Sequence, residues 1–112
     1  MTTEREQLKM AAKACGLHFN PTLKLKQGLH IVKPDAKCQS DQVLWDPKND
    51  DGDCARMEVA LGIELTWFFD RVDALACDVA PVVEYFADHN GDKNAARRAA
   101  SVAVAAEIGR LK

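Results

Sequence analysis

The stretch "IELTWFFDRVDALACDVAPVVEYF", residues 63–86, decides the fold. Apolar and polar side chains alternate along its beginning with the two-residue period of a half-buried strand. A turn near Asp70 and a second turn before the last run divide it into strands that are joined by connections of hairpin length. It therefore predicts an antiparallel meander whose three strands cover 63–69, 72–77 and 82–86.

Two helices are predicted before this meander and one after it. The first covers 3–15 and begins at a capping box whose N-cap is Thr3. The second covers 52–61, and the third is an alanine-rich helix over 92–108 that is expected to end at Gly109. Helices packed on an antiparallel sheet of three or more strands make an α+β layered sandwich. The 112 residues are expected to form this as a single domain.

The segment over 20–42 is the part that the sequence leaves open. Leucines and lysines alternate over 23–26, and the chain can turn at Gly28 before a second alternating run over 29–31. This pattern is compatible with a hairpin. A short strand is expected over 43–45.

An acidic segment, "LWDPKNDDGDC" over 44–54, raises the question of a cation site. An EF-hand loop needs glycine at position 6 and glutamate at position 12. A loop that starts at Asn49 places Cys54 and Ala60 there, and a loop that starts at Asp88 fails in the same way. We therefore predict no metal site, with an irregular Ca²⁺ or Mg²⁺ site as the alternative.

The same segment has the composition of a helix start. Asp50 or Asp51 can cap the first turn, where free amides and the helix dipole stabilise a carboxylate. Asp53 falls three residues before Arg56, so that these two side chains can pair on one helix face. Trp45 is expected to hold the turn against the core.

Motifs of catalysis and of cofactor binding are missing from the sequence. It holds no Ser/His/Asp arrangement that we can place, no phosphate-binding glycine loop and no dinucleotide fingerprint. The four cysteines lie 23, 16 and 23 residues apart without a C-x-x-C pair, which disfavours both a disulfide framework and zinc. We therefore expect a protein that is not an enzyme, with no catalytic residue and no cofactor; the alternative is an uncharacterised hydrolase.

Charge suggests a protein partner. The net charge of −2 gives no drive toward nucleic acid or anionic membrane, so direct nucleic-acid binding is not expected, and no run is apolar enough for a membrane span. Between residues 58 and 91, however, seven acidic residues face one basic residue, Arg71. We expect six of them to form an acidic binding face: Glu64, Asp70, Asp73, Asp78, Glu84 and Asp88. Ordinary solvated strand faces are the simpler interpretation.

Three arginines offer an alternative site. Arg97 and Arg98 lie near the start of the last predicted helix, and Arg56 lies close to the acidic turn. Guanidinium groups beside a helix N-terminus can hold a phosphate. The alternative function is therefore a small-ligand or nucleotide-binding protein.

The sequence resembles a known family at two places. "LWDPKNDDGDCARMEVALGI" is similar to a W-[DN]-P-x-x-D-D-G-D-x-x-R-[LM]-x-V-x-L pattern of small phage proteins, the phage α–β–α (ABA) sandwich domain family. "EYFADHNGDKNAARRAASVAVAAEIGR" looks like the closing segment of that family, and "LKMAAKACG" is similar to its opening helix. The chain departs from the pattern over 20–42 and 70–81. The matched positions include Trp45, Pro47, Asp50, Asp51, Gly52, Asp53, Arg56, Arg97, Arg98, Glu107 and Gly109.

This resemblance implies a phage or prophage origin and a sandwich fold, and it implies no reaction. Together with the charge pattern it predicts a small accessory protein in the cytoplasm of a bacterial host. We expect it to act as a non-enzymatic binding module for a host or phage protein, with inhibition of a host defence complex as the most concrete form. A symmetric homodimer is the default expectation for self-association.

Overall fold

The computed structural model describes residues 4–19, 28–32 and 42–112. It confirms the predicted α+β fold, with three helices and a three-stranded antiparallel sheet, β3-β4-β5, beside a two-stranded hairpin. In chain order the elements are α1 (Glu4–Ala14), β1 (Leu29–Val32), β2 (Gln42–Trp45), α2 (Asp51–Leu61), β3 (Glu64–Trp67), β4 (Arg71–Leu75), β5 (Val82–Tyr85), the 3₁₀ helix η1 (Phe86–His89) and α3 (Lys93–Arg110).

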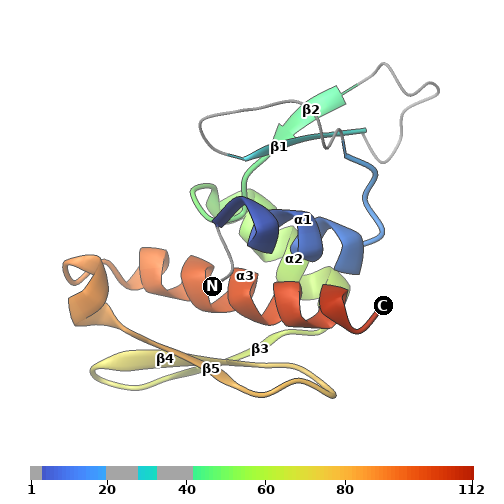
Figure 1. Cartoon of the computed structure of the whole chain (residues 1–112). Coiled ribbons are helices and arrows are strands. Elements are labelled where there is room, and N and C mark those ends of the chain that lie inside the picture. Colours follow the sequence, from blue (N-terminus) through green and yellow to red (C-terminus); the bar gives the residue numbers. More distant parts are fainter. Residues whose placement is uncertain (1–3, 20–27, 33–41) are drawn as a thin grey trace.

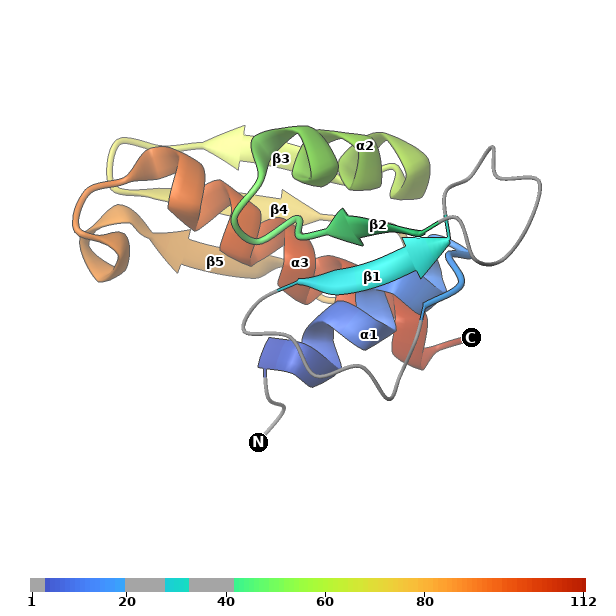
Figure 2. The ribbon, with the colours of Figure 1, turned by 90° about the horizontal axis from the view of Figure 1, so that it is seen from above.

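The described elements stack in layers (Figure 1). The three-stranded sheet lies on one side, α3 runs across its inner face, and α1 and α2 lie beyond α3. The β1–β2 hairpin covers the far side of the helices (Figure 2). All the described helices thus lie on one face of the three-stranded sheet, whose outer face has no described element over it. No helix of this described portion has the length and apolar character that a membrane span requires.

Strand register assigns each residue of the sheet to a face. Trp67 pairs with Val72 and Leu65 with Ala74, so these four side chains point toward the helices. Val72 and Ala74 are completely buried, as expected for the central strand. The alternate residues point outward, where Asp73 pairs with Thr66 on one side and Val83 on the other. Outward-facing residues of the three strands are Glu64, Thr66, Arg71, Asp73, Leu75, Val83 and Tyr85.

Helix α3 is the centre of the core. It contacts α1, α2, β4 and β5, so that its buried residues lie on more than one face of the helix. Alanine and valine dominate its buried positions, and small side chains let neighbouring elements approach closely. The helix also does not end at Gly109, as predicted from the sequence, but continues to Arg110.

Gly109 has a different role in the structure. A Cβ atom built at this position would lie only 2.7 Å from the carbonyl carbon of Met10 and nearer still to its oxygen. Here α1 and α3 approach each other so closely that no side chain fits between them. The glycine that was interpreted as a helix stop is therefore a helix-crossing residue.

The N-terminal helix and the hairpin agree in part with the sequence. Helix α1 buries Leu8, Ala11 and Ala12, and Gly16 ends it at φ +72°. The predicted Thr3 cap lies outside the described residues, as does the predicted strand over 23–26. The described run 29–32 pairs with β2, from Leu29 opposite Trp45 to Val32 opposite Gln42.

Candidate functional site

The acidic turn starts helix α2, as the sequence predicted. Asp50 is the N-cap, and its Oδ2 accepts a hydrogen bond of 2.8 Å from the Asp53 amide. Asp53 accepts one of 3.0 Å from the Asp46 amide and pairs with Arg56 at 2.6 Å. Trp45 is buried behind this turn. The described residues contain no group of three histidine, cysteine or acidic side chains that could hold a metal ion.

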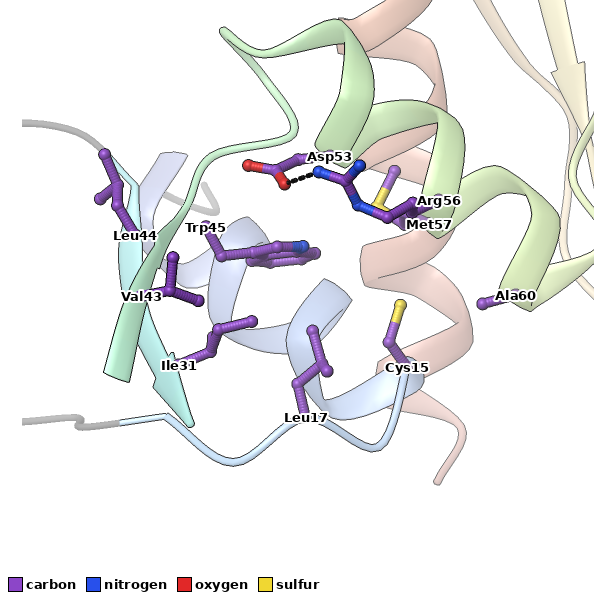
Figure 3. Close-up of a pocket in the computed structure, with 10 residues that line it drawn as sticks. All are labelled: Cys15, Leu17, Ile31, Val43, Leu44, Trp45, Asp53, Arg56, Met57 and Ala60. Carbon is purple, nitrogen blue, oxygen red and sulfur yellow. Dashed lines mark hydrogen bonds and ion pairs between the residues drawn. The ribbon is translucent and has the colours of Figure 1, made fainter. Parts of the chain in front are cut away.

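A pocket opens beside this turn, between the β1–β2 hairpin, the end of α1 and helix α2 (Figure 3). Its volume is about 290 Å³, and the Trp45 indole extends across its middle. The Asp53–Arg56 ion pair lies at its edge. The lining residues are Cys15, Leu17, Ile31, Val43, Leu44, Trp45, Asp53, Arg56, Met57 and Ala60.

The three arginines of the alternative ligand site do not converge. Arg97 binds Glu58, and Arg98 binds Asp51 at 2.6 Å and the Lys48 carbonyl at 2.9 Å. Of the three, only Arg56 lines this pocket. Each guanidinium is thus already paired with a carboxylate of helix α2. Arg97 and Arg98 join this helix to α3, whereas the Arg56 pair lies within α2.

Glu58 is the centre of a buried polar cluster between α2 and α3. One of its oxygens accepts hydrogen bonds from Ser101 at 2.5 Å and Arg97 Nε at 3.1 Å, and Cys54 Sγ lies 3.6 Å from it. Its other oxygen accepts from Arg97 Nη2 at 2.5 Å. Glu58 belongs to the acidic run between residues 58 and 91, yet it is buried. Two spacings in the sequence could have indicated this cluster. Glu58 follows Cys54 by four positions and Ser101 follows Arg97 by four, so each pair lies on one face of its helix.

The cluster does not expose its nucleophilic groups. Cys54 and Ser101 are completely buried. Burial, with the Glu58 charge as a second cause, raises the pKa of the Cys54 thiol to about 12. The thiol therefore stays protonated near neutral pH, where a thiolate is needed for reaction. The cluster joins two helices and is not a candidate active site.

This yields a prediction about cysteine reactivity. In native protein at pH 8, iodoacetamide should modify exposed Cys77 at least about tenfold faster than Cys54. The buried thiol also makes stability depend on pH, because the pKa of Cys54 is higher in the folded than in the unfolded protein. The protonated thiol contributes fully to the free energy of unfolding below the ordinary thiol pKa, and this contribution is lost as the pH rises toward about 12. Peptide mass spectrometry after timed alkylation measures both rates, and urea-unfolded protein is the control in which they should converge. Equal rates in the native state would contradict this burial.

The six acids of the predicted binding face are spread over the sheet. Glu64 and Asp73 lie on its outer face, whereas Glu84 is on the helix side and contacts His89 at 2.7 Å. Asp70 lies in the β3–β4 turn at one end, and Asp78 lies in the β4–β5 connection at the other. Asp88 lies in η1. The structure therefore does not bring the six onto one face.

Aromatic residues, which the sequence analysis assigned only to strands, gather at one end of the sheet. We define the aromatic tip as Trp67, Phe68, Phe69 and Tyr85. Phe69 is 92% exposed at the β3–β4 turn, and the other three are between 40% and 48% exposed. The signal was the run "WFF" directly before a turn, because three successive aromatics cannot all point to one buried face.

Contacts at the base hold the tip in place. The Phe68 amide donates to the Arg71 carbonyl at 2.8 Å, and the Phe86 amide donates to the Asp70 carbonyl at 3.0 Å. The Arg71 guanidinium lies over the Phe68 ring, 4.1 Å from its centre. Phe69 is therefore exposed to solvent on a turn that backbone hydrogen bonds hold in place.

Comparisons of the chain with protein-family models, with curated proteins and with solved structures found no match. The resemblance to the phage sandwich family thus stays a prediction from its motifs.

Proposed function

We propose that this chain is a non-enzymatic protein-binding module that docks through the aromatic tip. One observation carries this proposal: a phenylalanine that is 92% exposed stands at the end of a hydrogen-bonded turn. Phe68 and Tyr85 are half-exposed near Arg71 at this end of the sheet, and Trp67 is half-exposed on the helix side. Contiguous exposed apolar surface on a small protein marks an interaction site more often than a single exposed residue does.

The composition of the tip is that of an interface centre. Aromatic residues and arginine are enriched among the residues that dominate binding energy. Arg71 lies between Phe68, over which it stacks, and Tyr85, opposite which it is paired in the sheet. Because the turn is already ordered, little conformational entropy is lost when a partner encloses Phe69.

We further propose that the partner is a different protein of the bacterial host or of the phage, met in the host cytoplasm. The phage or prophage origin rests on the two motifs of the resemblance. A host defence complex is the most concrete candidate, because small phage proteins that bind without catalysis can act by covering a surface. Asp70, which lies in the same turn as Phe69, favours a partner whose contact surface is basic at its rim.

Replacing Phe69 tests this function. In affinity purification from host lysate, Phe69→Ala should reduce recovery of the specific partner about 10- to 30-fold, since an interface anchor is worth roughly 2 kcal/mol. Val59→Ala is the matched control, because Val59 is 84% exposed on α2, away from the tip. Quantitative mass spectrometry measures both.

Three results would count against the proposal. Equal recovery by Phe69→Ala and wild type would remove the tip from the interface, and loss of recovery in Val59→Ala would place the interface on α2. A stable homodimer that dissociates in Phe69→Ala would show that the occupant of the tip is a second copy of the chain.

A further inference from the structure

We propose that the cleft beside helix α2 binds a small organic cation, with an apolar or aromatic body in the pocket of Figure 3 and an ammonium or guanidinium head at its acidic rim. This site is separate from the aromatic tip and does not depend on the proposed protein partner.

Two adjoining hollows make up the cleft. The apolar one has a volume of about 290 Å³, and the polar one beside it about 460 Å³. They share Val43, Leu44, Asp53 and Arg56, so they form a continuous depression between β2 and α2. A ligand that extends across both needs an apolar part and a polar part.

The apolar part fits a ring or a short hydrocarbon chain. Its walls carry Leu17, Ile31 and Met57, and the Trp45 indole extends across its middle. An aromatic body can stack on or meet the edge of this indole, and a cation near its face gains further attraction. The volume is at the small end of the range for ligand pockets, which restricts the body to about one ring.

The charge of the polar part selects a cationic head. Among the residues that the structure describes, Asp46, Asp50 and Asp53 line it with one basic side chain, Arg56. Three negative groups and one positive give these residues a formal charge of −2. Arg56 is held by Asp53 at 2.6 Å. An anionic head would have to compete with Asp53 for this guanidinium against a net negative field, whereas a cation leaves the pair intact.

A bare metal ion does not fit these carboxylates as well. Asp46 accepts two hydrogen bonds from Asn49, and Asp53 accepts from the Asp46 amide and from Arg56. These oxygens are committed, and the described part of the chain holds no three-ligand metal set. An organic cation needs only one or two acceptors, such as exposed Asp50, because the apolar body supplies the remaining affinity.

Paired probes with the same body test this inference. In a Trp67→Phe background, in which Trp45 is the only tryptophan, 2-phenylethylamine and 3-phenylpropionate are titrated against indole fluorescence at low salt. The amine should give a saturable change with at least about tenfold higher affinity than the acid, as expected for a net negative rim.

Two variants locate the site. Arg56→Gln should strengthen amine binding, because among the described residues it removes the one positive charge of the rim. Lys93→Gln, which removes a positive charge outside the cleft, should leave binding unchanged. Ala60→Phe, which fills the pocket from an exposed helix position, should abolish it, with thermal melting as the check on folding.

Equal affinity for the two probes, tighter binding of the acid, or no saturable response in the Trp67→Phe protein would each overturn the inference. A response that persists in Ala60→Phe would also overturn it. None of these results bears on partner recovery through Phe69, so the two proposals fail separately.

Discussion

Glu58→Ala should lower the free energy of unfolding by about 3–5 kcal/mol, the range for breaking a buried ion pair from one side. The variant leaves the Arg97 guanidinium, whose side chain is only 17% exposed, without its carboxylate. Ser101 and Cys54, both completely buried, lose the same acceptor. Urea unfolding followed by circular dichroism measures the loss, with the slope of the transition checked for constancy.

Two companion variants make this test specific. Glu58→Met combined with Arg97→Met should be much less destabilising than Glu58→Ala, because two apolar side chains leave no unpaired charge. Glu107→Ala breaks an exposed pair with Arg110 on α3 and should change stability by less than about 1 kcal/mol. A loss below about 1 kcal/mol in Glu58→Ala, or a double variant as unstable as the single one, would contradict the role of this cluster.

Gly109→Ala should destabilise the protein by up to about 3 kcal/mol, although alanine is intrinsically the better helix residue by roughly 0.5–1 kcal/mol. The added methyl group would meet the backbone of Met10, and backbone cannot rotate away as a side chain does. The expected sign is therefore opposite to helix propensity. Thermal and urea unfolding measure it.

Gly52→Ala is the matched control, since it makes the same substitution inside helix α2. Its new Cβ would lie 3.3 Å from Asp50 Oδ2 and 3.4 Å from the end of Arg56, both of which are side-chain atoms that can shift. We expect it to be neutral or slightly stabilising. A stabilising effect of Gly109→Ala would show that α1 and α3 do not pack as closely as the structure has them.

Local patterns predicted most of the fold. The alternation in 63–86 predicted the meander, and the aspartates before Cys54 predicted the cap that Asp50 forms. Each of these signals is confined to a few neighbouring residues, so it can be interpreted without knowing what packs against it. Local patterns could not predict which strand pairs with the one at 29–32, because its partner β2 lies ten or more residues further along the chain.

The parts that the sequence did not predict depend on contacts between distant elements. A glycine at the end of a helical pattern, such as Gly109, indicates the end of a helix. Only the structure shows that the Met10 backbone lies against it. Glu58 looks like one more surface acid until Arg97, 39 positions away, is brought beside it. The six acids looked like a face because sequence shows their number and not the side of the sheet to which each points.

The exposure of the aromatic tip also depends on contacts between distant elements, which the sequence does not show. Trp67 continues the apolar alternation and was expected on the buried face of its strand, yet it is 48% exposed and meets Phe86 at the end of the sheet. Whether an apolar strand residue is covered depends on where the covering helix ends. This end of the sheet is therefore an aromatic surface with Asp70 beside it in the turn.

Photo-crosslinking in host cells tests the binding function most directly. A benzophenone amino acid is placed at position 69 of the tip or, in the control, at position 59 of α2, and cells are irradiated before lysis. The account predicts one discrete crosslinked product from position 69, containing a single other protein, and none from position 59. Products from position 59 alone, or a diffuse mixture from both positions, would contradict it.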